Sequence, residues 1–402
     1  MRINKYLDTN MKRITIFALE NIGNGGDEML GDTTIYHLNK IGNYSIKRKQ
    51  LIPLYKELGL AYIVDWGIGS GLIRLSYKLG GGNIAHRLFD IGYKISNFRY
   101  LWKATKDTDC IIYAVGMLKY STQDFSHVFD LINRIATYRH IPVLMSAMSI
   151  EKPNEKDWRF KQLVRAVNRE CVKIITTRDG IGGLERLRKY YIKRPNIVSD
   201  YVGDPALWAS ECYEIKKKEN NGKKILGIGL IRTDIYEDYE GGLTKSQLKD
   251  FYRRVVAHFL RSEKTLFKLF CNGTDSDYAF GKELIEEFNL PQDQLLPKPK
   301  TARELVHLIS GFDVVFGARL HACITSVSLG IPVSGLLWDN KLDFFSKSVG
   351  IREYFSSTED VKDLKALSNI ENSFAYKYDH KAILQLKNKT HKYILEFIQQ
   401  WI

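Results

Sequence analysis

The chain contains 402 residues, and its 60 lysines and arginines exceed its 46 aspartates and glutamates, which leaves a formal net charge of +14. This length fits two domains, because a single domain usually takes ~150 residues. Hydrophobic residues make up 44% and charged residues 26% of the chain, a composition that excludes a disordered protein. The positive charge predicts an anionic partner, and nucleic acid, acidic membrane and phosphorylated small molecules all remain open at this point.

The cysteines and the apolar runs predict a cytoplasmic protein. Five cysteines are scattered along the chain without a Cys-x-x-Cys pair or a Cys/His cluster, so neither a disulfide framework nor a structural zinc site is expected, and no metal is assigned. The apolar run at residues 14–19 is too short for a signal peptide. The longest apolar region, residues 314–338, includes Arg319 and His321, which suits a strand, a helix and a strand in a core.

Short β-rich runs alternate with helical stretches in chain order. The first strand is expected at residues 13–19, followed by a glycine-rich loop and a helix that starts at Asp27. Further strands of this first series are expected at residues 110–115, 143–146 and 173–177, with helices at 157–170 and 182–191. A second series of strands is expected at residues 225–230, 268–271, 314–316 and 333–337.

This alternation predicts parallel sheets with helices on both faces. The expected fold class is α/β, with two Rossmann-like, doubly wound domains that face each other across a cleft. The expected divisions are an N-terminal domain at residues 1–210 with a loose extension at 1–10, a linker at 211–224, a C-terminal domain at 225–376 and an amphipathic helix at 377–402. In such sheets the ligand lies beyond the carboxyl ends of the strands, so the residues there are the candidates for function.

Two candidate segments follow strands of the first series. The sequence NIGNGGDE at residues 21–28 has glycines that let backbone N–H groups point toward an anion, although a plain turn with Asp27 as helix cap fits equally well. It is not GxGxxG, so NAD is not expected. The sequence TTRD at 176–179 places Arg178 at the cleft edge, where it either binds a ligand or pairs with a neighbouring carboxylate. Asp179 suits the cap of the next helix.

The segment at residues 313–332 carries the most information. A buried strand is expected to end at Arg319, followed by a helix that ends at Gly330. Arg319 and His321 flank Leu320, so both polar side chains are expected on one side while Leu320 packs inward. A guanidinium group there suits a carboxylate or phosphate, and histidine exchanges a proton near neutral pH. A lone histidine in such a segment is usually structural, but the Arg-x-His pair at a strand end favours a function.

The next strand end adds a third polar group to this edge. The sequence WDNK at residues 338–341 follows the strand at 333–337 directly. Lys341 is therefore expected to lie at the same edge of the sheet as Arg319 and His321, although a solvated surface lysine is the usual alternative.

These motifs resemble those of the polysaccharide pyruvyl transferase family, from about residue 13 to about residue 350. The matching sequences are GNGGDE at 23–28, TRD at 177–179, GARLHA at 317–322, GIPV at 330–333 and WDNK at 338–341. The segment at 109–120 also fits, with Ala114, Val115 and Gly116 where the family commonly has three glycines. The resemblance implies a fold like that of the GT-B glycosyltransferases.

The resemblance also implies an activity. Such an enzyme moves the pyruvyl group of phosphoenolpyruvate onto two hydroxyls of a sugar in a bacterial capsule or exopolysaccharide, which forms a cyclic ketal and releases phosphate. Phosphoenolpyruvate is a co-substrate, and no cofactor is expected. The donor site is assigned to the C-terminal side, with binding residues Arg178, Arg319, Leu320, His321 and Lys341. Of these, Arg178, Arg319 and His321 are expected to be catalytic, with protonated His321 delivering a proton to the donor methylene carbon.

The acceptor is expected to be a sugar, as a lipid-linked oligosaccharide, on the N-terminal side. Its candidate contacts are Asn24, Asp27 and, in the loop CNGTDSD at residues 271–277, Asn272. Each of these residues also fits a helix cap or a turn, and that interpretation is slightly favoured.

Two other functions are weighed against this one. A GT-B glycosyltransferase could hold a nucleotide sugar in the same cleft, but no acidic residue is obvious as a ribose contact. A nucleic-acid-binding protein is suggested only by the net charge of +14, and no RRM, KH, zinc-finger or helix-turn-helix signature accompanies it, so no specific nucleic acid is expected.

The helix expected at residues 377–402 has an apolar face and many lysines elsewhere. That face carries Ile383, Leu386, Ile394, Ile398 and Trp401. Packing of this helix across both domains is favoured, and loose attachment to the inner face of the plasma membrane is the alternative.

Overall fold

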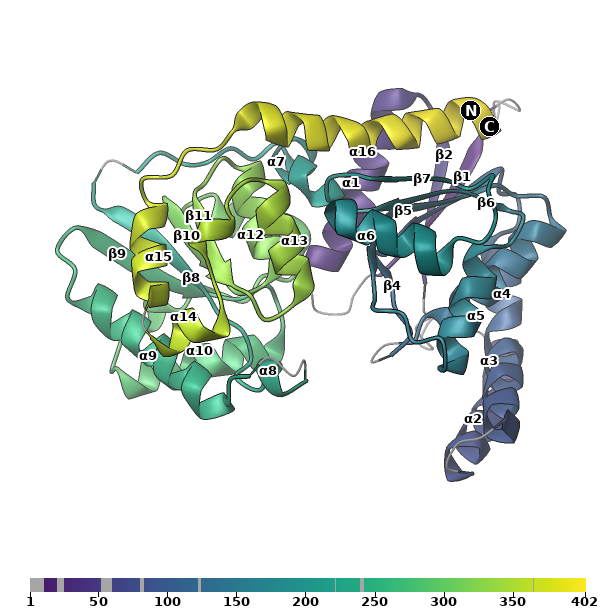
Figure 1. Cartoon of the computed structure of the whole chain (residues 1–402), viewed down its shortest axis with the longest axis horizontal. Helices are drawn as coiled ribbons and strands as arrows, with labels where there is room; N and C mark the ends of the chain where they lie inside the picture. The colour runs from purple at the N-terminus through teal and green to yellow at the C-terminus, as the bar shows by residue number, and fades with distance from the viewer. Residues whose placement is uncertain are drawn as a thin grey trace, which may run out of the picture.

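The computed structural model of the protein describes residues 11–19, 25–51, 60–79, 83–121, 124–220, 222–238, 242–363 and 365–402. These residues form two α/β domains that lie side by side, and a long C-terminal helix lies across both (Figure 1). Each domain contains a parallel sheet with helices on both faces. The predicted fold class of two doubly wound domains is confirmed.

The N-terminal sheet has parallel strands in the order β2-β1-β3-β5-β6-β7, and β4 pairs with the end of β5. Its strands are β1 (Arg13–Ala18), β2 (Ser45–Gln50), β3 (Cys110–Ala114), β4 (Met117–Leu118), β5 (Val143–Ile150), β6 (Val172–Thr177) and β7 (Val198–Tyr201). Because side chains alternate along a strand, Ile14 and Ile16 of β1 join one core cluster and Phe17 joins the cluster on the opposite face.

Helices cover both faces of this sheet. They are α1 (Gly25–Ile41), α2 (Leu60–Lys78), α3 (Asn83–Ala104), α4 (Ser126–Tyr138), α5 (Trp158–Val167) and α6 (Gly180–Arg186), which continues as a π-helical turn at Leu187–Tyr191. Helices α2 and α3 form a hairpin that projects beyond the body of the domain (Figure 1).

The C-terminal sheet has parallel strands in the order β12-β11-β10-β8-β9. Its strands are β8 (Lys224–Gly229), β9 (Thr265–Phe270), β10 (Val314–Gly317), β11 (Val333–Leu336) and β12 (Phe355–Ser356). Its helices are α8 (Ile235–Asp238), α9 (Lys245–Leu260), α10 (Asp275–Glu287), α11 (Ala302–Ile309), α12 (Leu320–Ser328), α13 (Asn340–Ser348), α14 (Thr358–Lys362) and α15 (Lys365–Ser373). Short 3₁₀ turns occur at Gln292–Gln294 and Arg352–Tyr354.

The two domains are joined by direct packing as well as by the chain. A 3₁₀ turn at Pro205–Trp208 and helix α7 (Ala209–Tyr213) share one apolar cluster with Met29 of α1 and with α11 and α12. The carboxylate of Glu28 in α1 accepts a hydrogen bond of 2.9 Å from the backbone N–H of Ala302. Ala302 is the first residue of α11, so a side chain of one domain binds the positively polarised N-terminus of a helix in the other.

Helix α16 (His380–Trp401) bridges the domains. Ile383 and Leu386 belong to the cluster that contains α11 and α12, whereas Ile394 and Ile398 belong to the N-terminal core beside β1. Trp401, at the end of the helix, is 38% exposed.

The apolar face of α16 therefore packs against the two domains. Membrane attachment through this face, the alternative considered from the sequence, is wrong because inserting it into a bilayer would pull the helix off both domains. In the part of the chain that the structure describes, no helix is long and apolar enough to cross a membrane.

The contact between α1 and α16 makes stability depend on pH. His37 of α1 is fully buried, with its Nδ1 3.2 Å from Nδ1 of His391 in α16. Burial, followed by the charges of His391, Lys40 and Lys387, lowers the pKa of His37 to about 3. The unfolded chain binds a proton here below about pH 6.5 while the folded chain does not, so this stability is complete above pH 6.5 and is lost as pH falls.

We expect the free energy of unfolding to fall more steeply between pH 7 and pH 5 in the wild type than in His37→Gln, by about 1–2 kcal/mol over that interval. Denaturant unfolding at several pH values measures this difference. His380→Gln, an exposed histidine at the start of α16, is the control and should keep the wild-type slope. An unchanged slope in His37→Gln would contradict this account.

Candidate active site

Strand ends from both domains meet at one place. Arg178 follows β6, and His321 and Lys341 follow β10 and β11. Arg178 and Lys341 both act electrostatically on the imidazole of His321, which places the three side chains close together. From the strand ends, the sequence predicted Arg178 at the cleft edge and Lys341 at the same edge as Arg319 and His321.

His321 lies in the first turn of α12, buried where the two domains touch. A Cβ atom added to Gly26 of α1 would lie 2.2 Å from His321 Nδ1, so the glycine leaves the space that the ring fills. The Nε2 atom of His321 is buried and has no hydrogen-bond partner among the described residues. A buried ring nitrogen without a partner is costly, and a bound ligand would satisfy it.

Burial lowers the pKa of His321 to about 4. The carboxylate of Asp204 raises this pKa, whereas the charges of Arg178 and Lys341 lower it further. The imidazole is therefore neutral near pH 7 in the absence of a ligand.

Arg178 is held in a buried ion pair. Its Nη1 donates to Asp204, and both side chains are almost fully buried. The other oxygen of Asp204 accepts from the backbone N–H of Ala206 at 2.9 Å. Gly116, which has a φ of +65°, lies so close that an added Cβ would be 3.0 Å from the Arg178 guanidinium. The glycine of the Ala-Val-Gly segment therefore gives the arginine its space.

Arg319 has a different partner. Its Nε and Nη2 donate to the two oxygens of Asp277 at 2.9 and 2.7 Å, and Asp277 is completely buried. The alternation expected for Arg319 and His321 ends here because α12 begins at Leu320, which is partly buried against the core. Arg319 thus binds within its own domain while His321 faces the N-terminal domain.

A pocket of about 370 Å³ lies between the domains and includes Lys341. It is lined by Met117, Leu118, Lys119, Ser121, Ser149, Ile150, Glu151, Lys152, Asp179, Arg186, Asp339, Asn340, Lys341 and Phe344. All three of its acids have backbone partners: Glu151 accepts from the N–H of Tyr120 at 2.8 Å, Asp339 from the N–H of Lys341 at 3.0 Å, and Asp179 from the N–H of Ile150. The pocket is thus lined by four cationic side chains, those of Lys119, Lys152, Arg186 and Lys341, while its acids already accept hydrogen bonds from the backbone. This balance of charge favours an anionic ligand.

Asp179 is one of the residues that line this pocket. Its carboxylate accepts hydrogen bonds from the backbone N–H of Ile150 at 2.6 Å and from Ser149 Oγ at 3.0 Å, and it makes no cap to α6. Burial raises the pKa of Asp179, although the bond from Ile150 and the charge of Arg178 act in the opposite direction. The side chain therefore joins two strand ends instead of capping its own helix.

Two of the three residues expected to contact the acceptor, Asp27 and Asn272, lie near the domain contact. Asn24 lies outside the described residues. Asp27 is buried near the start of α1, and Asn272 is buried with its backbone carbonyl accepting from the N–H of Gly25 at 3.2 Å. The glycine-rich loop of one domain and the polar loop of the other therefore touch beside His321.

Sequence reasoning missed three groups that organise this site: Asp204, Asp277 and Glu28. Asp204 precedes Pro205, and an aspartate before a proline is a common start of a helical turn, which is a usable signal. Asp277 lies in the predicted polar loop, where nothing distinguishes it from its polar neighbours. Glu28 gives no signal, because its partner Ala302 is distant in sequence. In the described part of the chain, no group of three or more His, Cys, Asp or Glu side chains could hold a metal.

Comparison with known proteins decides the family. The model of the family described as polysaccharide pyruvyl transferase matches residues 24–340, a range that contains Arg178, Arg319 and His321 and ends one residue before Lys341. The chain belongs to the polysaccharide pyruvyl transferase family. The family predicted from the motifs is confirmed, and the protein is a transferase. Among curated proteins, none matches the sequence.

Solved structures show where the fold recurs. A UDP-GlcNAc 2-epimerase from Neisseria meningitidis bound to UDP-GlcNAc has a TM-score of 0.58 and 14% identity, covering 97% of this chain and 100% of its own. The epimerase from Methanocaldococcus jannaschii has a TM-score of 0.55 and 12% identity, covering 97% and 99%. A trehalose-phosphate synthase from Burkholderia vietnamiensis has a TM-score of 0.51 and 11% identity, covering 97% of this chain and 96% of its own. At such identities the likeness concerns the fold alone, and it supports the predicted GT-B-like arrangement.

The contact between Gly26 and His321 gives a prediction about this transferase. We expect Gly26→Ala to lower the free energy of unfolding by about 1–3 kcal/mol, because the added methyl group overlaps the buried imidazole. Gly71→Ala is the matched control: its methyl group would meet nothing within 4 Å, and it should stabilise the protein by about 0.4–1 kcal/mol. Denaturant unfolding of both variants measures the effect. Equal stability of the two would show that the domains do not pack this closely.

Proposed function

We propose that this transferase moves the pyruvyl group of phosphoenolpyruvate onto two hydroxyls of a sugar, with a cyclic ketal and phosphate as products. The observation that carries the proposal is the buried His321 Nε2, which has no partner among the described residues and lies beside Arg178 and Lys341 from opposite domains. Family membership supports the reaction class.

Phosphoenolpyruvate suits this site because its carboxylate and phosphate are close together and need several fixed cations in a small volume. Arg178 is oriented by Asp204 and Arg319 by Asp277, so neither guanidinium must be ordered when the donor binds. Lys341 can follow the ligand, since its side chain is 24% exposed and 3.6 Å from Asp339. We assign donor binding to these three cations with Leu320 and His321.

The proposed chemistry begins with protonation of the donor methylene carbon by His321. The adjacent carbon becomes cationic, and the first sugar hydroxyl adds to it and loses its proton. Phosphate then departs, and the second hydroxyl closes the ketal. One of the two hydroxyl protons replaces the proton taken from His321, and the other leaves with phosphate. Asp179, a buried carboxyl group with a raised pKa at the pocket wall, is a suitable acceptor for one of them.

The proton on His321 has to arrive with the donor. The imidazole is neutral near pH 7 in the ligand-free protein because its pKa is about 4. The negative charges of phosphoenolpyruvate, placed beside the ring, favour the imidazolium and raise this pKa. Substrate binding then creates the acid that the reaction uses, and a free enzyme without donor holds no reactive proton there.

The acceptor in this proposal is a sugar on a lipid-linked oligosaccharide, as in the assembly of a bacterial capsule or exopolysaccharide. Asn24, Asp27 and Asn272 are proposed acceptor contacts, and the latter two lie at the domain contact beside His321. The scheme calls for no cofactor and no metal, and we propose a cytoplasmic protein that works at the inner face of the plasma membrane.

The direct test is phosphate release from phosphoenolpyruvate in the presence of lipid-linked galactosides or N-acetylmannosaminides. We expect release that depends on the acceptor, and a fall of about 10²–10⁴-fold in His321→Ala because general acid catalysis is lost. His307→Ala, an exposed histidine in the same domain, should keep the wild-type rate.

A near wild-type rate in His321→Ala would remove the role given to this residue. Calorimetric titration with a panel of nucleotide sugars separates the rival glycosyltransferase: tight binding of a nucleotide sugar and none of phosphoenolpyruvate would overturn the proposed donor.

Proton linkage gives a second test. We expect phosphoenolpyruvate binding near pH 7 to take up close to one proton per site, because the pKa of His321 rises from about 4 when the anion binds. Calorimetry in buffers of different ionisation enthalpy measures this uptake. In His321→Asn the part due to the imidazole should disappear, whereas His307→Asn should behave as the wild type. Equal uptake in the wild type and in His321→Asn would contradict the proposed arrival of the proton.

A further inference from the structure

The hairpin of α2 and α3 carries an unusual share of the exposed apolar surface. Among the described residues, eight of the fourteen large hydrophobic side chains that are exposed lie on this hairpin or at the adjoining end of α4. We name these eight the hairpin face: Ile68, Leu75, Leu79, Ile84, Ile91, Phe98, Trp102 and Tyr138. The hairpin projects from the N-terminal domain (Figure 1), so nothing in the described fold covers this surface.

The exposed large hydrophobic side chains of α3 form a narrow stripe. Ile84, Ile91 and Phe98 are each seven residues apart, and Trp102 follows four residues later. At about 100° per residue these side chains lie within a sector of roughly 40°. Ile84 is 71% exposed although it is a large apolar residue. An apolar stripe of this kind on a helix ordinarily faces a partner.

Helix α2 extends the stripe into a face. Ile68, Leu75 and Leu79 repeat with spacings of seven and four residues. Gly69 in α2 and Gly92 in α3 lie where the two helices touch. In each helix the stripe lies about a quarter turn away from this glycine, in the same direction of rotation about the helix axis. Because the helices run antiparallel, the two stripes share one side of the hairpin.

Small residues bring the two helices close together. A Cβ added to Gly69 would lie 2.3 Å from the backbone oxygen of Gly92 and 2.0 Å from Ser96 Oγ, and one added to Gly92 would lie 2.5 Å from the oxygen of Gly69. The two backbones can approach closely at these glycines, and Leu72 and Ile73 of α2 also lie at this contact, next to Gly92.

Cations flank the stripe of α3 on both sides. By the helical period, Arg87 and Lys94 lie on one flank and Arg99 and Lys103 on the other. The acid Asp90 lies about 100° from the middle of the stripe, next to Lys94, with which it forms an ion pair. Helices α2 and α3 together carry six lysines and arginines against two aspartates. An apolar face edged with cations and aromatic rings is the pattern of a helix that lies on an anionic bilayer.

Aromatic rings and cations continue this pattern at the base of the hairpin. Phe98 stacks on Trp102 with ring centroids 5.4 Å apart, and Trp102 lies 5.8 Å from Tyr138 of α4. The guanidinium of Arg139 lies 3.8 Å from the Trp102 ring centre. The three aromatic residues, but not Arg139, line a groove with Arg134 and Ile135 of α4 and with Ile95 of α3. Amphipathic aromatic rings are enriched at the boundary between lipid and water.

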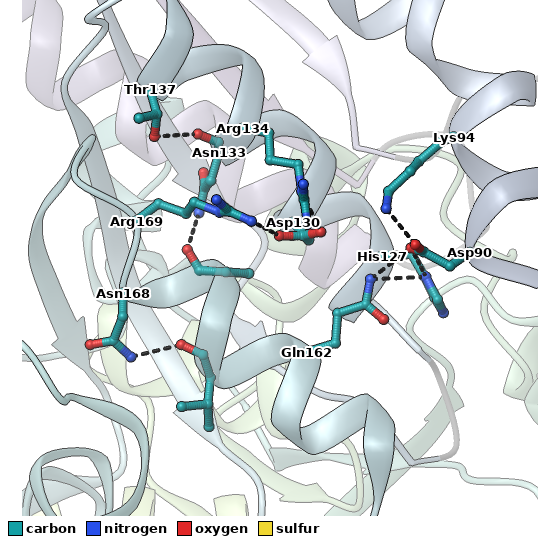
Figure 2. A network of polar contacts seen from close by, with 12 residues as sticks. Asp90, Lys94, His127, Asp130, Asn133, Arg134, Thr137, Gln162, Asn168 and Arg169 are labelled. Atoms are coloured by element: carbon teal, nitrogen blue, oxygen red, sulfur yellow. Dashed lines mark hydrogen bonds and ion pairs between the residues drawn. The ribbon is translucent and has the colours of Figure 1, made fainter. Parts of the chain in front are cut away.

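A polar network fixes the hairpin to the body of the domain. Figure 2 shows Asp90 and Lys94 of α3 pointing toward His127 and Gln162 of α4 and α5. Gln162 Nε2 donates to Asp90 at 3.0 Å, and His127 Nδ1 lies 3.3 Å from the same carboxylate. The acid of α3 is thus turned inward and occupied, so the negative charge stays away from the hairpin face.

We propose that the hairpin face docks on an anionic lipid bilayer. Charge decides between this occupant and a second copy of the chain: two hairpin faces placed against each other would bring the exposed Arg87 and Lys103 of both copies together, whereas a bilayer of acidic lipids attracts both of them. The inference deepens the location that we propose for the enzyme but depends on no step of the donor chemistry. It also moves the membrane contact from α16, whose apolar face is buried, to the hairpin.

The test is sedimentation of the full chain with vesicles of phosphatidylglycerol and phosphatidylcholine in equal amounts, in low salt. We expect binding to these vesicles, release when salt is raised, and little binding to phosphatidylcholine alone. Ile84→Ser with Ile91→Ser should lower the partition coefficient about tenfold. Arg87→Gln with Lys103→Gln should lower it ~30-fold, since each cation near an anionic surface contributes about fivefold.

Matched pairs elsewhere on the surface are the controls. Leu266→Ser with Leu384→Ser removes two equally exposed leucines, and Lys245→Gln with Lys264→Gln removes two exposed cations. Both pairs should bind vesicles as the wild type does. Absence of wild-type binding in low salt, or equal losses in control and hairpin variants, would overturn the proposal.

Two further measurements keep the outcomes separate. Light scattering that finds a dimer disrupted by Ile84→Ser with Ile91→Ser, without vesicle binding, would show that the hairpin face contacts a second copy and would overturn the bilayer as occupant. Phosphate release from phosphoenolpyruvate with a water-soluble acceptor should be unchanged in the hairpin variants. Vesicle binding without such release in any protein would refute the donor chemistry and leave the membrane surface standing.

Discussion

The contact between Gly26 and His321 is the constraint on which the arrangement of the two domains depends. The imidazole fills the volume that a side chain at position 26 would need, so the first turn of α1 can rest directly on the first turn of α12. Glu28 strengthens this contact because it binds the N-terminus of α11 across the same boundary. The site therefore exists only when the domains are together: Arg178 comes from one of them, and His321 and Lys341 come from the other.

Acidic partners fix the orientation of the two arginine side chains of the site. Arg178 and Arg319 each pair with a carboxylate that is almost or completely buried. Removing either carboxylate would leave a poorly solvated charge, so these pairs act as fixed units. In the proposed reaction a donor anion would meet guanidinium groups whose directions are already set, whereas His321 is neutral near pH 7 and its Nε2 has no hydrogen-bond partner among the described residues. The surplus of positive charge seen in the composition explains little of this, since the charges of the site are largely balanced and the hairpin holds part of the excess.

Local patterns predicted the parts of the fold that are locally determined. The buried strands β1, β3, β6, β8 and β10 appear as apolar runs, and the strand-end rule alone was enough to locate Arg178, His321 and Lys341. The partners of these residues were not predictable, because Asp204 and Asp277 approach through tertiary packing that no sequence spacing records. Strand β2 reads SIKRKQ and lies at the sheet edge, so it lacks the apolar signal of a central strand. The helices of the hairpin carry apolar residues on the outside, which defeats the assumption that such residues mark a core.

Helix α16 has a consequence for how the chain reaches its native state. Ile394, Phe397 and Ile398 complete the cluster on one face of the N-terminal sheet, yet they are the last part of the described chain to be synthesised, after every strand of the C-terminal domain. During translation, the part of the N-terminal sheet that these residues cover therefore stays exposed until the C-terminal domain has been synthesised. Domains usually fold as units in the order of synthesis; here the first domain to be made is the last to be finished, and its folding is coupled to that of its neighbour.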